Sequence, residues 1–335
     1  MSTRALPAPR LARRRLRGVF GFLVRRTLLG IVTLFLVSVI VFAATQALPG
    51  DAARAILGRT ATPESLAALR TQLHLGEPVL QQYGHWLGGF VRGDLGDSLA
   101  AQEPVTRLLG KRLENSAVLV LLAALISTPL AVALGAFTAR RRDGPFDHGA
   151  SILMLALAAL PEFVVGIALV VLLGTTVFTL LPAVSLIPPD ESPWSHLREL
   201  VLPTLTLVLA VFPYTARIMR ASMVEVLESD YVEMARLKGM PERTVVWRHA
   251  VPNAIAPTIQ VTALNLAYLA GGIVVVEFVY GYAGIGSALV DAVHNRDVPV
   301  VQALAMLIAA VYIVLNLLAD VAAILVSPRL RTSLQ

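Results

Sequence analysis

The chain contains no cysteine, and this absence excludes a disulfide framework, a thiol nucleophile and a thiolate-bound metal. Charged residues are also scarce, since Lys, Arg, Asp and Glu make up only 15% of the 335 residues. Hydrophobic residues account for 56%, and the mean hydropathy is +0.71. These values lie outside the range of soluble globular domains, so the composition predicts a membrane protein.

Two catalytic patterns are missing as well. The phosphate-binding pattern G-x-x-x-x-G-K-[ST] does not occur, because its nearest fragment, Gly110-Lys111-Arg112, lacks the first glycine and the hydroxyl. The histidines stand singly, in loops or near the ends of apolar runs; they are His74, His85, His148, His196, His249 and His294. We therefore expect neither ATP hydrolysis by this chain alone nor an intramembrane enzyme, and no metal or cofactor bound by this chain.

Apolar runs of about twenty residues, enough to cross a hydrocarbon core of ~30 Å, occur along the whole chain. The candidates are residues 27–48, 117–137, 151–173, 200–215, 255–278 and 300–326. The fourth is the shortest, and Pro203 and Pro213 interrupt it. We retain it because an even number of spans fits the distribution of charge. The sequence thus predicts an all-α membrane protein with six transmembrane helices.

Basic residues are distributed unevenly between the segments that join these runs. Residues 1–26 contain eight arginines and no acidic residue, and residues 216–254 contain six lysines or arginines. The segments 174–199 and 279–299 contain one arginine each. The positive-inside rule therefore predicts that both termini, the arginines at 140–142 and residues 216–254 are cytoplasmic. The net charge of +6 is then a topology signal, and we expect no nucleic-acid partner.

Residues 49–116 form the longest external segment of this topology. Within it, Val79, Tyr83, Trp86, Leu87 and Phe90 recur at three- and four-residue spacing, which predicts one apolar stripe on a short helix. We expect this stripe to pack against the spans or to lie at the lipid interface rather than to bind solute.

Acidic residues inside the apolar runs are rare, and Glu162 lies near the middle of the third run. An ionisable group at this depth is expensive and faces a cavity or a partner. We favour a hydrogen-bonded carboxylate packed between helices, and keep a pore-lining group as the alternative. Glu277 and Asp320 lie near the ends of runs, so we expect structural roles for them.

A polar, basic insert over residues 233–257 separates the fourth and fifth runs. Asp230 and Glu233 have the spacing of a capping box, which predicts a helix start, and Gly239 is expected to end that helix in the left-handed conformation. Pro241 should begin a second helix that stops before Pro252. Physics alone leaves two alternatives open, an amphipathic loop in the lipid headgroups or a docking surface for a soluble partner.

Several blocks of the sequence resemble one family of transport proteins. "EMARLKG", followed by "RHAVPNAIAP", is similar to the EAA loop of ABC importer permeases; Glu233, Ala235 and Gly239 match its core, and Met234 departs from it. Further blocks, in the family's order, are "LPGDAA" at 48–53, "RGDLGDSL" at 92–99, "LPEFVVG" at 160–166 and "VVVEFVYGYAGIG" at 274–286. Over nearly its full length the chain resembles the dipeptide permease B type of the peptide and nickel importers.

The resemblance implies a type I ABC importer permease fold, with a cytoplasmic coupling helix and an external loop between transmembrane helices 1 and 2. It also implies a bacterial inner-membrane location, a second homologous permease, two ATPase subunits that bind ATP and Mg²⁺, and an extracytoplasmic solute-binding protein. The coupling residues would be Glu233, Met234, Ala235, Lys238, Gly239, Arg243 and His249.

Three alternatives remain at this stage. The solute implied by the resemblance is a peptide, and nickel or glutathione would use the same architecture. A secondary transporter or channel is the alternative of another class. Such a protein would show intramembrane charge pairs or helices broken at the midplane. It needs no docking surface made of two short helices joined at a glycine.

Overall fold

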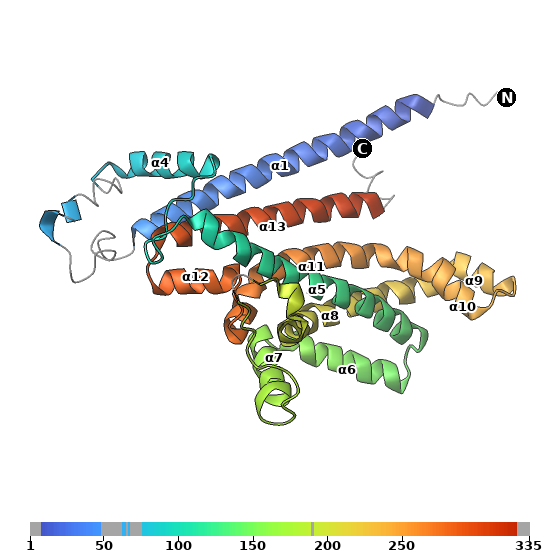
Figure 1. Ribbon diagram of the computed structural model, residues 1–335. Helices are drawn as coiled ribbons and strands as arrows, with labels where there is room; N and C mark the ends of the chain where they lie inside the picture. Colours follow the sequence, from blue (N-terminus) through green and yellow to red (C-terminus); the bar gives the residue numbers. More distant parts are fainter. Residues whose placement is uncertain (1–7, 48–61, 65, 68–75, 189–190, 327–335) are drawn as a thin grey trace.

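A computed structural model describes residues 8–47, 62–64, 66–67, 76–188 and 191–326 as a bundle of helices (Figure 1). The α-helices are α1 (Ala8–Gln46), α4 (Val79–Val91), α5 (Val105–Arg140), α6 (Pro145–Ala159), α7 (Glu162–Leu169), α8 (Leu197–Leu227), α9 (Asp230–Leu237), α10 (Glu242–Thr244), α11 (Val251–Tyr280), α12 (Ile285–His294) and α13 (Val298–Val326). Three short segments are the π-helices η2 (Val170–Thr175) and η4 (Val245–Ala250) and the 3₁₀-helix η3 (Pro193–Ser195). These residues contain no strand, so the all-α prediction is confirmed. The tail 327–335, His74 and "LPGDAA" lie outside the described residues.

Four of the described helices are long and apolar enough to cross a membrane: α5, α8, Gly21–Gln46 of α1 and Val298–Ala322 of α13. Two bent pairs bring the number to six if each pair is counted as one span. The first pair is α6 with Glu162–Thr175, and the second joins Glu242–Leu266 to Gly271–Tyr280. The bundle therefore contains four to six candidate spans.

The predicted helix over residues 151–173 is not continuous. It breaks at Leu160 and Pro161, and the two halves lie 105° apart. Proline lacks an amide proton and pushes the preceding residue out of the helical region; Leu160 has a ψ of 132°. As a consequence Glu162 begins α7 instead of lying in the middle of a straight span.

α8 is the central helix of the bundle and includes the short fourth run with both of its prolines. It packs against α5, α6, α7 and α11, and 67% of the residues in its most apolar stretch are buried. Pro203 and Pro213 are themselves buried, which fits the rule that prolines in spans are tolerated where neighbouring helices surround them.

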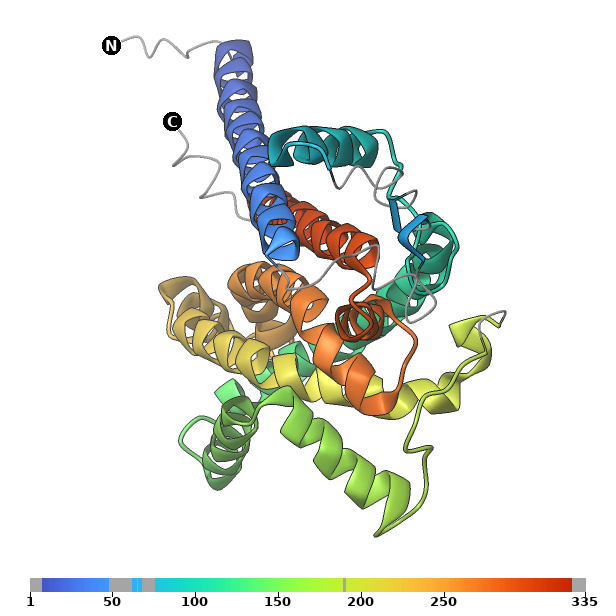
Figure 2. The same cartoon turned by 90° about the vertical axis from the view of Figure 1, so that its left-hand side faces the viewer.

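The two ends of the bundle carry different segments. Figure 1 places α9, α10, the turn between α5 and α6, the start of α1 and the end of α13 at one end, and α4 and α12 at the other. Figure 2 views the bundle from the α4 and α12 end. The segments that the arginine distribution assigned to one side of the membrane therefore gather at one end of the molecule.

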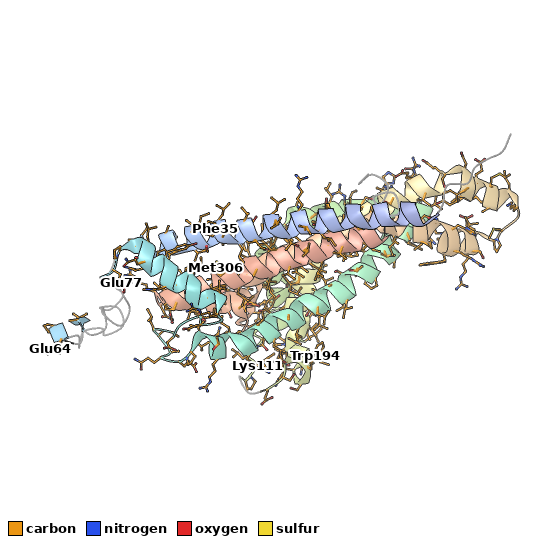
Figure 3. All side chains as sticks on the ribbon, turned by 90° about the horizontal axis from the view of Figure 1, so that it is seen from above. Phe35, Glu64, Glu77, Lys111, Trp194 and Met306 are labelled. Atoms are coloured by element: carbon orange, nitrogen blue, oxygen red, sulfur yellow. The ribbon has the colours of Figure 1, made fainter. Side chains whose placement is uncertain are left out.

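α1 lies on the periphery, alongside α13 (Figure 3). Phe35 of α1 is 51% exposed, whereas Met306 of α13 is 1% exposed. α4 contacts α1 through its apolar stripe, since the rings of Tyr83 and Trp86 lie 5.3 and 5.6 Å from the ring of Phe42. For these two residues the expectation that the stripe packs against the spans is confirmed.

Two buried carboxylates organise the end that carries α12. Asp297 accepts hydrogen bonds from Ser98 Oγ at 2.5 Å and from the amides of Leu99 and Ala100, both at 3.1 Å. These three hydrogen bonds connect the turn before α13 to the loop before α5.

Glu277 is the second of these carboxylates and is fully buried. It accepts a hydrogen bond from Ser116 of α5 and bonds from the amides of Gly286 and Ser287 at 2.7 and 3.0 Å. A Cβ on Gly286 would lie 2.4 Å from the backbone Cα of Val274, so the start of α12 requires glycine at this position. Glu277 and Asp320, which pairs with Arg26 at 2.5 Å, thus make structural contacts as expected.

We predict that Glu277→Ala lowers the thermal unfolding midpoint of the purified protein far more than Asp320→Ala. The first change leaves two buried backbone amides and a serine hydroxyl without their acceptor, which lowers the free energy of unfolding by roughly 2–5 kcal/mol. The second removes a partly exposed ion pair, worth about 1 kcal/mol or less. Tryptophan fluorescence during heating in detergent measures both, and equal shifts would contradict this assignment.

Candidate functional site

The candidate site is the connection between α8 and α11, residues 228–250, at the end of the bundle. Glu228 caps the end of α8, and α9 follows almost at once. The capping box predicted between Asp230 and Glu233 is wrong. Ser229 is the N-cap residue, its carbonyl accepts from the Glu233 amide at 3.1 Å, and no side chain caps this end. Asp230 and Glu233 instead lie in the first turn of α9, where acidic groups suit the helix dipole.

Gly239 ends α9 as predicted. Its φ is +75°, and its amide donates to the Arg236 carbonyl at 2.9 Å. A Cβ at this position would meet no atom within 4 Å. The left-handed backbone, and not crowding, is therefore what requires glycine here.

The prediction that the second helix stops before Pro252 is wrong. Helical structure begins at Glu242, after Pro241, and continues without a gap through α10, η4 and α11 to Tyr280. η4 is a π-helix that ends at Ala250, two residues before Pro252. Its wider hydrogen-bond spacing accommodates a residue that has no amide proton, so the chain passes through the proline without ending the helix.

α9 has one buried and one exposed face. Val232 and Ala235 are buried and pack with Val245. On the outside, Tyr231, Met234 and Leu237 are 46%, 54% and 75% exposed. Ala235 therefore fixes α9 to the rest of the connection.

The other predicted coupling residues differ in exposure. Met234, Glu233, Lys238, Gly239 and Arg243 are exposed. His249 lies in the π-helix and is half-buried, and its Nε2 atom is buried and has no hydrogen-bond partner among the residues that the structure describes. The structure thus brings five of the seven predicted residues to the surface of the connection.

An ion pair across the Gly239 turn escaped the sequence analysis. Arg236 donates to Glu242 from Nε at 3.2 Å and from Nη2 at 2.9 Å, and its Nη1 donates to the Leu227 carbonyl at 3.3 Å. The hydrogen bond from Arg236 lowers the pKa of the Glu242 carboxyl. Both side chains are more than two-fifths exposed, so the pair orients α9 against α10 and adds about 1 kcal/mol or less to stability. Opposite charges on either side of a glycine–proline turn are the signal that could have revealed it.

Two further ion pairs lie at this end of the bundle, one between α8 and α6 and one between the turn after α5 and the connection. Arg220 of α8 binds Asp147 of α6 with two hydrogen bonds of 2.6 Å, and Arg142 pairs with Glu228. The partners lie far apart in sequence, so local patterns could not reveal them.

Glu162 lies away from this connection, between α7 and α11. Tyr268 donates a hydrogen bond to Glu162 Oε2 at 3.0 Å. Among the described residues, no three His, Asp or Glu side chains stand close enough together to hold a metal ion.

Sequence profiles of two related families cover most of the chain. The profile of the family described as "Binding-protein-dependent transport system inner membrane component" matches residues 131–332. The profile for the N-terminal part of the binding-protein-dependent transport system membrane component matches residues 19–134. Together they include the connection, Glu162 and the α4 region.

Curated relatives match along almost their entire length. A probable peptide ABC transporter permease of Sinorhizobium fredii is 35% identical over 311 residues, 92% of this chain and 99% of the relative. A putative peptide transport system permease of Brucella abortus is 34% identical, over 93% of this chain and 99% of the relative. The glutathione transport system permease protein GsiC of Escherichia coli K12 is 34% identical, with the same coverage. The chain therefore belongs to the family of binding-protein-dependent transport system inner membrane components, as a multi-pass ABC transporter permease subunit of the type I fold.

Proposed function

We propose that this chain forms half of the translocation pore of an ATP-driven peptide importer and that a second, homologous permease forms the other half. The names of relatives that align over almost the whole chain support a peptide as the solute. Glutathione is the alternative, because one relative of equal coverage is a glutathione permease. The chain is a transport subunit and not an enzyme.

The membership of this family implies an ATPase and a solute-binding protein as partners. We propose that two ATPase subunits bind ATP and Mg²⁺, and that they dock on the connection between α8 and α11. The end of the bundle that carries α9 would then face the cytoplasm of a bacterium, together with both termini. The arginine distribution, which gathers at this end, supports that orientation.

The single observation that carries the proposal is the exposed ridge of α9, defined as Tyr231, Met234 and Leu237. These large side chains follow at three-residue spacing on a helix whose opposite face is already buried. Exposed apolar groups on an otherwise charged helix mark a contact surface. α9 and α10 also project beyond the turn between α5 and α6 in Figure 1, which favours a soluble partner over a loop lying in lipid headgroups.

The continuous helix behind the ridge supports a coupling role. A displacement of α9 would be passed to α10 through the Arg236–Glu242 pair and to η4 through the contact with Val245, and from there to α11. Broken helices, which we had associated with secondary transporters, do occur in this structure. The family membership excludes that alternative, so breaks alone do not separate the two classes.

We predict that Gly239→Val abolishes ATP-dependent peptide uptake and solute-stimulated ATP hydrolysis while the chain still inserts into the membrane. A non-glycine residue in the left-handed region costs about 1–2 kcal/mol, and β-branching adds to this. Gly239→Asn is the matched control, because asparagine tolerates this conformation, and it should keep most of both activities. Uptake assays in reconstituted vesicles measure the effect, and full activity of the valine variant would refute a coupling role for this turn.

A second prediction concerns the ridge itself. Leu237→Ser should weaken association with the ATPase subunits by about five- to thirtyfold, since burial of one leucine contributes roughly 1–2 kcal/mol. Because Leu237 is 75% exposed, folding should not change. Leu80→Ser is the control, since Leu80 is 84% exposed on α4 at the opposite end. The dissociation constant of the detergent-solubilised complex with the ATPase subunits is measured for both variants. Equal affinities would contradict docking at α9.

The solute can be tested directly in vesicles that contain the assembled importer and its binding protein. We expect ATP-dependent uptake of a radiolabelled dipeptide that exceeds the uptake of glutathione. The reverse order would make glutathione the solute, and uptake without ATP would overturn the proposed energy source.

A further inference from the structure

Glu162 and Tyr268 meet where two membrane-spanning segments change direction. Glu162 is the first residue of α7, directly after the break that turns the chain by 105°. Tyr268 lies between Leu266 and Gly271, where the second bent pair turns by 59°. Its hydroxyl donates to Glu162 Oε2 at 3.0 Å. A Cβ on Gly272 would lie 3.2 Å from Glu162 Oε1, so both carboxylate oxygens lie against α11.

This pair is open on one side. Glu162 is half-buried, and Tyr268 is 53% exposed. The exposed face of α11 continues through Leu264, Gly271 and Val275, which carry no charge. Glu162 forms no ion pair with any residue that the structure describes, so no cation of this chain compensates it there.

Lipid is an unsuitable neighbour for this face. Glu162 and Tyr268 lie within the apolar runs 151–173 and 255–278, at membrane depth. Carboxylates at that depth face a protein interior or water, and interrupted helices are tolerated only where protein or a water-filled cavity covers them. The break at Leu160 and Pro161 and the carboxylate lie at the same place. Two independent constraints therefore exclude hydrocarbon from this surface.

We propose that the face formed by Glu162, Tyr268 and the exposed side of α11 lines the solute path, and that Glu162 takes the ammonium group of a passing peptide. This inference rests on the proposed function and adds the chemical group that the pore recognises. A carboxylate is an acceptor only, and the hydroxyl of Tyr268 occupies one of its acceptor sites, which leaves others for an ammonium donor. The neighbouring Leu264, Gly271 and Val275 offer no fixed partner for the rest of the solute.

This role for Glu162 differs from the one that we favoured from the sequence. The carboxylate is hydrogen-bonded between two helices, as favoured there, but it is not enclosed. A fixed charge that met the side chains of the solute would discriminate among varied peptides. Every linear peptide with a free amino terminus carries the same ammonium group, however, so one acidic site does not restrict the side chains that pass.

The natural lack of cysteine makes a direct test straightforward. A single reporter, Leu264→Cys, is placed on the exposed face of α11 in membrane vesicles that hold the assembled importer. Its labelling rates with trimethylammonioethyl and sulfonatoethyl methanethiosulfonate are compared in the presence and absence of ATP. We expect both water-soluble reagents to react in at least one nucleotide state, with the cationic reagent favoured. Replacing Glu162→Gln should reduce that preference about tenfold, as expected for the loss of one nearby charge.

Control variants keep the result decisive. Val275→Cys is a second reporter on the same face in case the first disturbs folding, and Ile152→Cys, 69% exposed on α6, gives the rate for a surface away from the pair. Tyr268→Phe removes the hydrogen bond but keeps the charge, so the preference for the cation should persist. Reporters no more reactive than Ile152→Cys, or a preference unchanged by Glu162→Gln, would overturn the proposal. ATP-driven uptake is measured in the same vesicles, so a charge preference without uptake would refute the peptide importer and leave the site standing.

Discussion

A helix that continues through prolines is the feature on which the rest of the structure depends. From Glu242 to Tyr280 the backbone stays helical although Pro252 and Pro257 each lack an amide proton. The π-helix η4, which ends two residues before Pro252, widens the hydrogen-bond spacing at the first of these prolines, whereas Pro257 lies inside the regular α-helix α11. A small polar connection outside the spans is thereby joined rigidly to a helix in the centre of the bundle.

The two ends of α11 meet different constraints. At one end, α9 is fixed by buried Val232 and Ala235 and leaves its ridge exposed at the surface. At the other end, Glu277 binds α5 and the start of α12 through buried hydrogen bonds. The bend between Leu266 and Gly271 lies between these two fixed ends, next to Glu162. We therefore expect a displacement of α9 to change the angle of this bend, where the proposed solute site lies.

The sequence predicted the features that depend on local chemistry. Hydropathy gave the all-α membrane class, and the left-handed preference of glycine placed the turn at Gly239 correctly. It failed at the capping box, where Ser229 and not Asp230 is the N-cap residue, and at two prolines. Pro252 did not end its helix because the π-helix before it adapts, whereas Pro161 did break its helix; the two prolines look alike in sequence. Tyr268 could not be linked to Glu162, because only the packing of α7 on α11 brings them together.

We infer that η4 and the first half of α11 move as one rigid rod when the proposed ATPase partners change state. Spin labels at Arg248→Cys and Leu264→Cys lie on either side of both prolines, about 24 Å apart at the usual rise per residue. A third label at Phe163→Cys reports on α7, across the bend. The electron–electron distance between the first two labels should stay constant with and without ATP, while the distance from Arg248→Cys to Phe163→Cys should change. If the first distance changes or broadens with nucleotide, the helix is not the element that couples the two sites.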